Sequence, residues 1–135
     1  MTFIDTNILL YAICPSATER LKAEKAREIL RRDDLALSVQ VLQEFYVQAT
    51  RPTRAQPLSH AEATALIELW LRFTVIEVSV SVMQAALHLK DRFRTSYWDA
   101  AILAAANCAV CHEVLSEDLN PGQTYNGVRV VNPFS

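Results

Sequence analysis

The chain has 135 residues, of which 51% are hydrophobic, and its 13 Lys and Arg against 15 Asp and Glu give a formal net charge of −2. This length fits a single domain over residues 1–135, and this apolar fraction excludes a disordered chain because it can form a sizeable buried core. The 2 glycines are too few for a turn-dense all-β protein, and the negative net charge taken alone argues against nucleic-acid binding.

The first part of the chain alternates short apolar runs with helix-like segments. The run "TFID" is typical of a buried strand, and "LALS" is a second strand candidate. A helical segment follows each of them, and the segment 17–32 has an apolar stripe at helical spacing. The stripe consists of Leu21, Ala26, Ile29 and Leu30. We therefore expect strands over 2–5 and 35–38, and helices over 7–13, 17–32 and 39–50.

The second part continues this alternation. Pro52 and Pro57 end the preceding helix, and Ser59 with Glu62 forms a capping-box pattern that opens a helix to about Arg72. The β-branched run "TVIEVS" indicates a strand. We expect strands over 74–79, 113–116 and 128–131, and helices over 81–93 and 96–106. Strands that alternate with helices predict an α/β fold with right-handed crossovers and a mostly parallel sheet of four to five strands, flanked by helices.

The N-terminal sequence bears on where the protein acts. "MTFIDTNILLYAICP" has no basic leader or small-residue cleavage site, and its apolar run is far shorter than the roughly 20 residues of a membrane span. We therefore expect a cytoplasmic protein that does not enter a membrane. The run "CAVCH" over 108–112 fits the haem-attachment pattern C-x-x-C-H, but attachment requires export. Cys108 and Cys111 are therefore interpreted as small buried side chains.

Acidic residues lie where the predicted strands end. Asp5 ends the first strand, and Glu117 and Asp118 directly follow the strand over 113–116. Asp99 begins the helix that leads to that strand. Because the carboxyl ends of parallel strands meet at one edge, we expect these acids to converge there. Carboxylates that converge are best tolerated around a divalent cation, and oxygen ligands favour Mg²⁺ or Mn²⁺.

Each acid also has a purely structural interpretation. Asp5 can cap the helix after it, Asp99 can complete a capping box with Ser96, and Asp118 can form a turn. Glu44 falls opposite the apolar face of its helix, so periodicity alone predicts a solvated side chain. The three histidines have no spacing that supplies a zinc cage. They are His60, His88 and His112.

Four stretches together resemble the PIN domain family, and most closely its VapC-type toxins. They are "FIDTNILLYA", "SVQVLQEFY", "SYWDAAILAAA" and "VLSEDLNPGQTYNGVRVVNPF". They occur in the family's order and extend over essentially the whole chain. The resemblance implies a three-layer α/β sandwich and a ribonuclease that depends on Mg²⁺ or Mn²⁺.

The resemblance also assigns site residues. The catalytic and metal-binding acids fall on Asp5, Glu44, Asp99 and Asp118. Supporting positions fall on Asn7, on Ser116 where Thr is common in the family, and on Glu117 as an accessory acid. The implied mechanism is hydrolysis of a phosphodiester bond by a metal-activated water, without a Ser or Cys nucleophile.

The partners implied by the resemblance are an RNA substrate, a second copy of the chain and a cognate antitoxin whose tail occupies the acidic cleft. Three basic groups are candidates for contacts with the RNA backbone, although solvated helix faces are their plainer interpretation. The groups are Arg20, Lys22, Lys25, Arg27, Arg31 and Arg32; Arg51 and Arg54; and Lys90, Arg92 and Arg94. The helices over 17–32 and 59–73 are the candidates for protein contacts.

Two other functions stay open at this point. An acidic Mg²⁺ site at strand ends also serves phosphotransfer domains, but those place paired acids after the first strand and a late lysine. Here "FIDTN" has one acid, and Arg129 is the only basic residue after Arg94. A catalytically silent PIN module used for binding is the other alternative, and the presence of all four acids argues against it.

Overall fold

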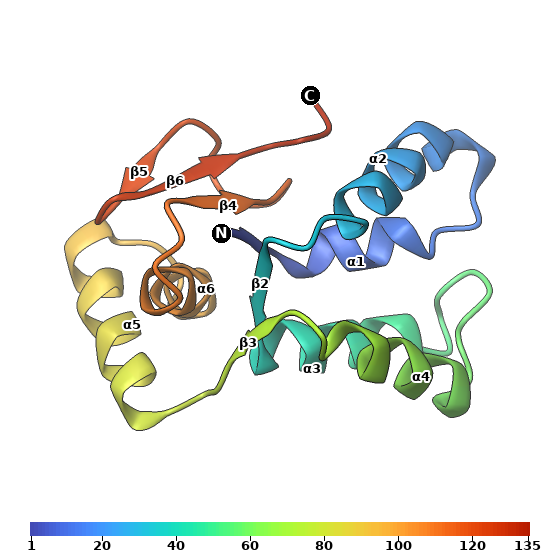
Figure 1. Ribbon diagram of the computed structural model, residues 1–135, viewed down its shortest axis with the longest axis horizontal. Helices are drawn as coiled ribbons and strands as arrows, with labels where there is room; N and C mark the ends of the chain where they lie inside the picture. Colours follow the sequence, from blue (N-terminus) through green and yellow to red (C-terminus); the bar gives the residue numbers. More distant parts are fainter.

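The computed structural model describes residues 1–135 and contains one six-stranded sheet with the strand order β3-β2-β1-β4-β6-β5 (Figure 1). The strands are β1 (Thr2–Ile4), β2 (Leu35–Ser38), β3 (Thr74–Ile76), β4 (Glu113–Leu115), β5 (Thr124–Tyr125) and β6 (Val128–Val131). The helices are α1 (Thr6–Ala12), α2 (Arg20–Leu30), α3 (Val39–Ala49), α4 (His60–Trp70), α5 (Val80–Phe93) and α6 (Tyr97–Cys108), and a 3₁₀ turn, η1 (Ala17–Glu19), precedes α2.

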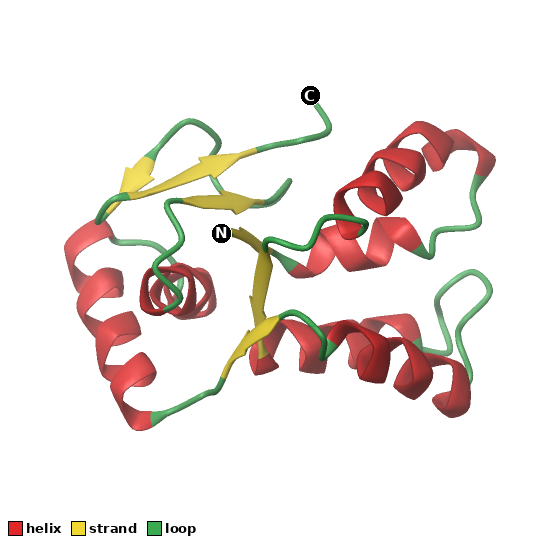
Figure 2. Cartoon of the chain, in the orientation of Figure 1, coloured by secondary structure: helices red, strands yellow, loops and turns green.

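The helices form one layer on each face of the sheet. Figure 2 shows α1 to α4 on one side of the strands and α5 and α6 on the other. Strands β3, β2, β1, β4 and β6 are parallel, and β5 pairs with β6 in the antiparallel direction. The three-layer α/β architecture expected from the sequence is therefore confirmed.

The core is centred on β1 and α6. Strand β1 pairs with β2 on one side and β4 on the other, and its residues Phe3 and Ile4 are fully buried. Helix α6 buries every residue from Ala100 to Ala106. Five of these seven residues are alanines, whose small side chains let the helix approach both the sheet and α5. A helix that is apolar on all sides is typical of a buried position.

Serine side chains begin four of the helices. Ser38, Ser59, Ser79 and Ser96 each accept a hydrogen bond from a backbone N–H in the first turn of α3, α4, α5 and α6. The expected capping box of Ser59 and Glu62 is complete. The predicted helices therefore begin and end within about two residues of their predicted positions, except for the one over 17–32.

The longest helix, α5, has 14 residues. No helix is long and apolar enough to span a membrane.

Three expectations require correction. The predicted helix over 17–32 is a 3₁₀ turn followed by α2, and Leu21 of its expected apolar stripe is 75% exposed. Strand β5 was not expected, although Asn126 and Gly127 form a two-residue turn in which both φ angles are positive. An Asn-Gly pair is the strongest short hairpin signal. Cys111 is buried, which raises the pKa of its thiol, but Cys108 is exposed.

We predict that two identical substitutions in α2 have unequal effects. Leu30→Ala removes a buried side chain and is expected to lower the free energy of unfolding by about 2 to 5 kcal/mol. Leu21→Ala lies on the exposed face and should change it by no more than about 0.5 kcal/mol. Urea unfolding followed by circular dichroism measures both. Equal losses would contradict the burial pattern of this helix.

Candidate functional site

The candidate site lies at the carboxyl ends of β1 and β4, in the middle of the sheet. The chain leaves β1 at Asp5 and β4 at Ser116, and the backbone N–H of Asp5 donates to the carbonyl of Leu115 (3.0 Å). The strand order reverses between β1 and β4, because β2 and β3 extend to one side and β6 and β5 to the other. Ligands of open α/β sheets bind at such a reversal.

Asp5 is held by hydrogen bonds to both carboxylate oxygens. It is 7% exposed, and it caps α1 because Oδ1 accepts from the backbone N–H of Thr6 (2.7 Å). Oδ2 accepts from the hydroxyl of Ser116 (2.7 Å). Burial raises the pKa of Asp5 to about 6, although these two hydrogen bonds lower it. The neighbouring carboxylates of Glu44 and Asp118 raise the pKa further, so negative charge at this point is not fully compensated.

Ser116 organises the turn that carries Asp118. The side chain is fully buried, and its oxygen accepts from the backbone N–H groups of Asp118 (3.1 Å) and Leu119 (3.2 Å). Its own proton goes to Asp5. The Ser116 hydroxyl therefore positions two of the four predicted acids. It bonds to the carboxylate of Asp5 and to the backbone N–H of Asp118.

Asn7 completes this arrangement from the first turn of α1. Its Nδ2 donates to Ser116 Oγ and to Asp118 Oδ2, both at 3.3 Å. Its Oδ1 accepts from the backbone N–H of Glu117 (3.2 Å). The amide of Asn7 thus orients the Asp118 carboxylate. This carboxylate does not form the turn considered from the sequence, in which it would accept a backbone N–H.

Glu44 contradicts the expectation from helical periodicity alone. The side chain is half-buried, and its two oxygens accept from Thr6 Oγ1 (2.8 Å) and Gln40 Nε2 (2.9 Å). Helix α3 packs against α1 as well as against the sheet and α4. The face of α3 that periodicity assigns to solvent therefore meets α1, and Glu44 lies beside the other acids.

Asp99 lies in the first turn of α6 without using its carboxylate as a cap. Its backbone N–H donates to Ser96 Oγ (3.1 Å), which is half of the expected capping box. The reciprocal bond is absent, whereas Ser59 and Glu62 make both bonds. The Asp99 carboxylate instead lines the same cavity as the other acids.

These side chains enclose a cavity of about 120 Å³. All four predicted acids line it, together with Thr6, Asn7, Leu10, Gln48, Trp98 and Ile102. None of the five ion pairs of the chain includes any of the four acids. The cavity therefore gathers carboxylates that have no basic partner within the chain.

The donor atoms of this cavity fit a hard divalent cation. Carboxylate, hydroxyl and amide oxygens suit Mg²⁺ or Mn²⁺, and no imidazole or thiolate lines the cavity. A cation would also offset the charge that raises the pKa of Asp5. No three His, Cys, Asp or Glu side chains are placed so that together they could hold a metal ion in this structure. The site thus supplies suitable donors without a preformed cage.

Glu117 faces another part of the surface. Its carboxylate forms an ion pair with Lys22 (2.7 Å) and accepts a hydrogen bond from the hydroxyl of Tyr11. The bond from Lys22 lowers the pKa of Glu117. Glu117 lines a neighbouring hollow of about 260 Å³ and not the carboxylate cavity. Its contacts tie the turn after β4 to α1 and α2.

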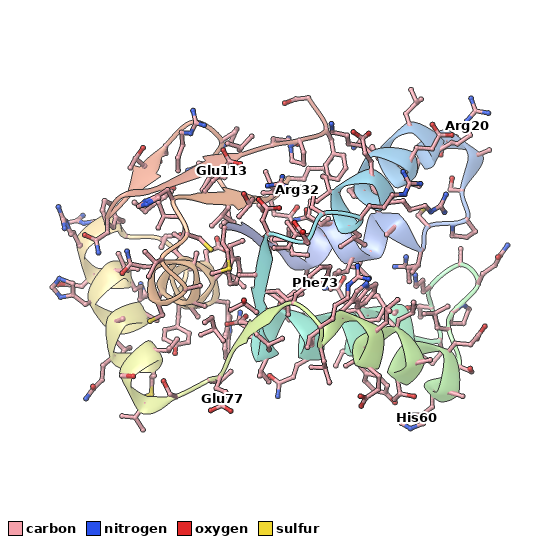
Figure 3. The ribbon with its side chains drawn as sticks, in the orientation of Figure 1. Arg20, Arg32, His60, Phe73, Glu77 and Glu113 are labelled. Atoms are coloured by element: carbon pink, nitrogen blue, oxygen red, sulfur yellow. The ribbon has the colours of Figure 1, made fainter.

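The three basic groups lie at different distances from the acids. Arg51 lines a groove that borders Glu44, and Arg54 lines the hollow beside Asp118. Arg20, in contrast, lies at the outer end of α2, as labelled in Figure 3. Arg51 and Arg54 therefore lie at hollows next to the acids, and Lys22 of the first group is near them through its ion pair with Glu117.

The chain matches the protein-family model described as PIN domain over residues 2–120. No curated protein sequence matches it. Solved structures share its fold over nearly the full length. The toxin-antitoxin complex from Klebsiella pneumoniae has a TM-score of 0.71 at 20% identity, and the match covers 99% of this chain and 98% of that chain.

Two further structures show the same likeness. VapC20 from Mycobacterium tuberculosis, described as a sarcin-ricin loop cleaving toxin, has a TM-score of 0.69 at 19% identity over 96% of this chain and 99% of that chain. DNA-bound VapBC from Salmonella typhimurium has a TM-score of 0.67 at 18% identity over 96% and 95% of the two chains. At these identities the likeness establishes a common fold.

We predict that Asp5 makes the metal-free protein less stable as the pH rises. The folded state holds the Asp5 proton up to about pH 6, whereas the unfolded state loses it near pH 3.8. The contribution of Asp5 to the free energy of unfolding therefore falls over this range and is constant above it. The loss is at most about 3 kcal/mol, at about 1.4 kcal/mol per pKa unit. This is measured by urea unfolding in EDTA between pH 4 and 8. The free energy of unfolding of Asp5→Asn should increase relative to that of the wild type as the pH rises to about 6.

A constant offset between the two proteins is also expected, because Asn keeps only one acceptor oxygen, so the pH dependence is the readout. Asp91→Asn makes the same chemical change at an exposed position of α5 and should parallel the wild type. Parallel curves for Asp5→Asn would show that the carboxylate has no raised pKa.

Proposed function

The chain belongs to the PIN domain family, and on that premise we propose that it is a metal-dependent ribonuclease, the toxin of a toxin-antitoxin pair. The observation that carries the proposal is the cavity in which Asp5, Glu44, Asp99 and Asp118 converge without a basic partner. Such a concentration of carboxylates opposes stability unless a cation compensates it. In a ribonuclease, these carboxylates would hold the metal ion that serves the hydrolysis of RNA phosphodiester bonds.

The residues divide into ligands and positioning residues. Asp5, Asp99 and Asp118 would hold Mg²⁺ or Mn²⁺, with Glu44 bound directly or through water. When bound, the ion supplies an activated water and stabilises the charge that develops on the phosphate. Ser116 would keep the Asp5 carboxylate in place through its hydrogen bond (2.7 Å). Asn7 would keep the Asp118 carboxylate in place through the hydrogen bond from its Nδ2 to Asp118 Oδ2 (3.3 Å).

Basic side chains beside the cavity support a nucleic-acid substrate. Arg51 lines a groove that shares Glu44 with the cavity, and Arg54 lines a hollow that shares Asp118 with it. Their guanidinium groups can neutralise phosphates on both sides of the cleaved bond, which would make binding salt-dependent. The negative net charge of the whole chain is compatible with this function, because the acids are gathered in the cavity that a cation neutralises.

The proposed partners follow from the similar structures. The structures from Klebsiella pneumoniae and Salmonella typhimurium are toxin-antitoxin assemblies. We infer that this chain likewise binds a cognate antitoxin, which inhibits it by occupying the acidic cleft. A second copy of the chain is the other proposed partner. Exposed leucines at the end of α4, Leu69 and Leu71, offer an apolar surface for it.

We predict that the purified chain, freed of any partner, cleaves RNA with Mg²⁺ or Mn²⁺ and not in EDTA. Asp99→Asn should lower cleavage by at least about 100-fold, the order of effect seen when a group that stabilises the transition state is removed. The same substitution should weaken Mn²⁺ binding in calorimetry. Cleavage is measured on a labelled oligonucleotide at several metal concentrations.

Asp91→Asn again serves as the matched control, since it removes an exposed acid of α5 without touching the cavity. It should keep wild-type cleavage. Equal cleavage by wild type and Asp99→Asn would place the activity elsewhere or in a contaminant. A wild type that binds Mn²⁺ but cleaves nothing would instead indicate a silent binding module. Transfer of a phosphoryl group to the chain would indicate the phosphotransfer alternative.

We also predict that the isolated chain is a dimer in solution. Leu69→Glu should shift the mass measured by light scattering from two chains to one, because a charge in an apolar interface is left unpaired. Leu87→Glu changes an equally exposed leucine on α5 and should leave the dimer intact. A single-chain mass for the wild type at 50 µM, a proposed assay concentration, would contradict the dimer.

A further inference from the structure

A groove of about 520 Å³ borders the carboxylate cavity. We call it the Trp98 groove. It is lined by three glutamines (Gln40, Gln43 and Gln48), Glu44, Val47, Arg51 and Trp98. Three of these residues, Glu44, Gln48 and Trp98, also line the cavity. A ligand whose phosphate lies against the acids would therefore extend directly into this groove.

Trp98 is the unusual member of this lining. Its side chain is 65% exposed, and it is the only Trp, Tyr or Phe of the chain on the exposed surface. The other tryptophan, Trp70, is 3% exposed and packs edge-on against Phe45 at 4.8 Å. Folding thus leaves one large aromatic ring uncovered, and leaves it beside the candidate catalytic site. An indole has the flat π-face on which nucleobases stack.

The backbone of Trp98 is fixed relative to the acids. Its carbonyl accepts from Gln40 Nε2 (3.4 Å), and the same nitrogen donates to Glu44 Oε1 (2.9 Å). The next residue is Asp99 of the cavity. Tyr97 contacts the indole edge-on with the ring centroids 5.0 Å apart. The backbone that carries the ring is therefore linked to Glu44 through Gln40, and the ring packs edge-on against Tyr97 with most of its surface open.

Gln43, Gln48 and Arg51 of the groove remain available to a ligand. Gln43 and Gln48 make no side-chain hydrogen bond within the chain, so each amide can offer a donor and an acceptor to a base edge. Arg51 belongs to none of the ion pairs. The groove thus combines an aromatic face, two free amides and a cation.

We propose that the Trp98 groove binds a nucleotide of single-stranded RNA next to the cleaved phosphate, with its base stacked on the indole of Trp98. The inference rests on the proposed ribonuclease function and assigns the residue that binds a base of its substrate. Bases of an RNA duplex are stacked on one another and paired, so none can lie on an indole. The substrate segment is therefore unpaired, and Gln43 and Gln48 contact the edge of its base while Arg51 contacts a phosphate.

Fluorescence tests the stacking directly. In Asp5→Asn, which should bind RNA without cleaving it, we expect a random-sequence single-stranded 10-mer RNA to quench Trp98 emission. Buried Trp70 provides a constant background. A duplex of the same length should not quench. In Asp5→Asn/Trp98→Leu the single strand should change the emission no further, because only Trp70 remains.

Cleavage kinetics test whether the contact serves the reaction. Trp98→Ala should raise KM for single-stranded RNA by about 5- to 150-fold, the range for loss of one stacked base, with a smaller change in kcat. Trp98→Phe keeps an aromatic face and should restore most of the loss. Mn²⁺ affinity should be unchanged in both variants, because the indole supplies no ligand. Leu87→Ala, which removes an exposed apolar side chain of α5, is the control and should behave as the wild type.

The outcomes separate this inference from the proposed function. A wild type without RNA cleavage and without Mn²⁺ binding overturns both. A wild type that cleaves RNA while Trp98→Ala cleaves with an unchanged KM overturns the inference and leaves the ribonuclease standing. Equal quenching by duplex RNA overturns it as well. So does a Trp98→Ala variant that keeps RNA cleavage but loses a co-purifying protein inhibitor, since the groove would then be a protein-binding surface.

Discussion

The hydroxyl of Ser116 links the ends of the two central strands, and the candidate site depends on this link. It donates to the Asp5 carboxylate after β1 and accepts the backbone N–H groups that follow β4. Because the group is fully buried, it has no water with which to exchange these bonds. Its geometry is therefore set by the packing of the sheet, and the spacing of Asp5 and Asp118 is set with it.

The site carries an electrostatic cost that the rest of the fold offsets. Burial and two neighbouring carboxylates raise the pKa of Asp5, whereas some carboxylates elsewhere have a basic partner: Glu117 pairs with Lys22, and Asp34 pairs with Arg32. The fully packed strands and helices α1 and α6 hold the acids together against their repulsion. Such a conflict between stability and local charge is typical of functional sites.

Short-range patterns predicted the strands and helices except β5 and the 3₁₀ turn before α2, because their apolar periods reflect burial against one partner. Three of the four acids were also predictable from their place at strand ends and at the start of a helix. Glu44 was not, since a helical wheel describes one buried face and α3 has partners on two sides. Whether the Asp99 carboxylate completes a capping box could not be read from the sequence, because Ser96 accepts the Asp99 N–H whether or not the carboxylate returns the bond. The Asn-Gly turn before β6 was a readable signal that periodicity alone misses.

The pairing of β1 with β4 has a consequence for biosynthesis. Ser116 and Asp5 are 111 positions apart in the chain, yet they share one hydrogen bond. A chain emerging from the ribosome can form β1, β2 and their helices early, but it has neither the central strand β4 nor the last carboxylate until translation has passed residue 118. The nascent chain therefore carries no complete carboxylate cavity. Long-range closure of this sheet delays the assembly of this cavity until most of the molecule has been made.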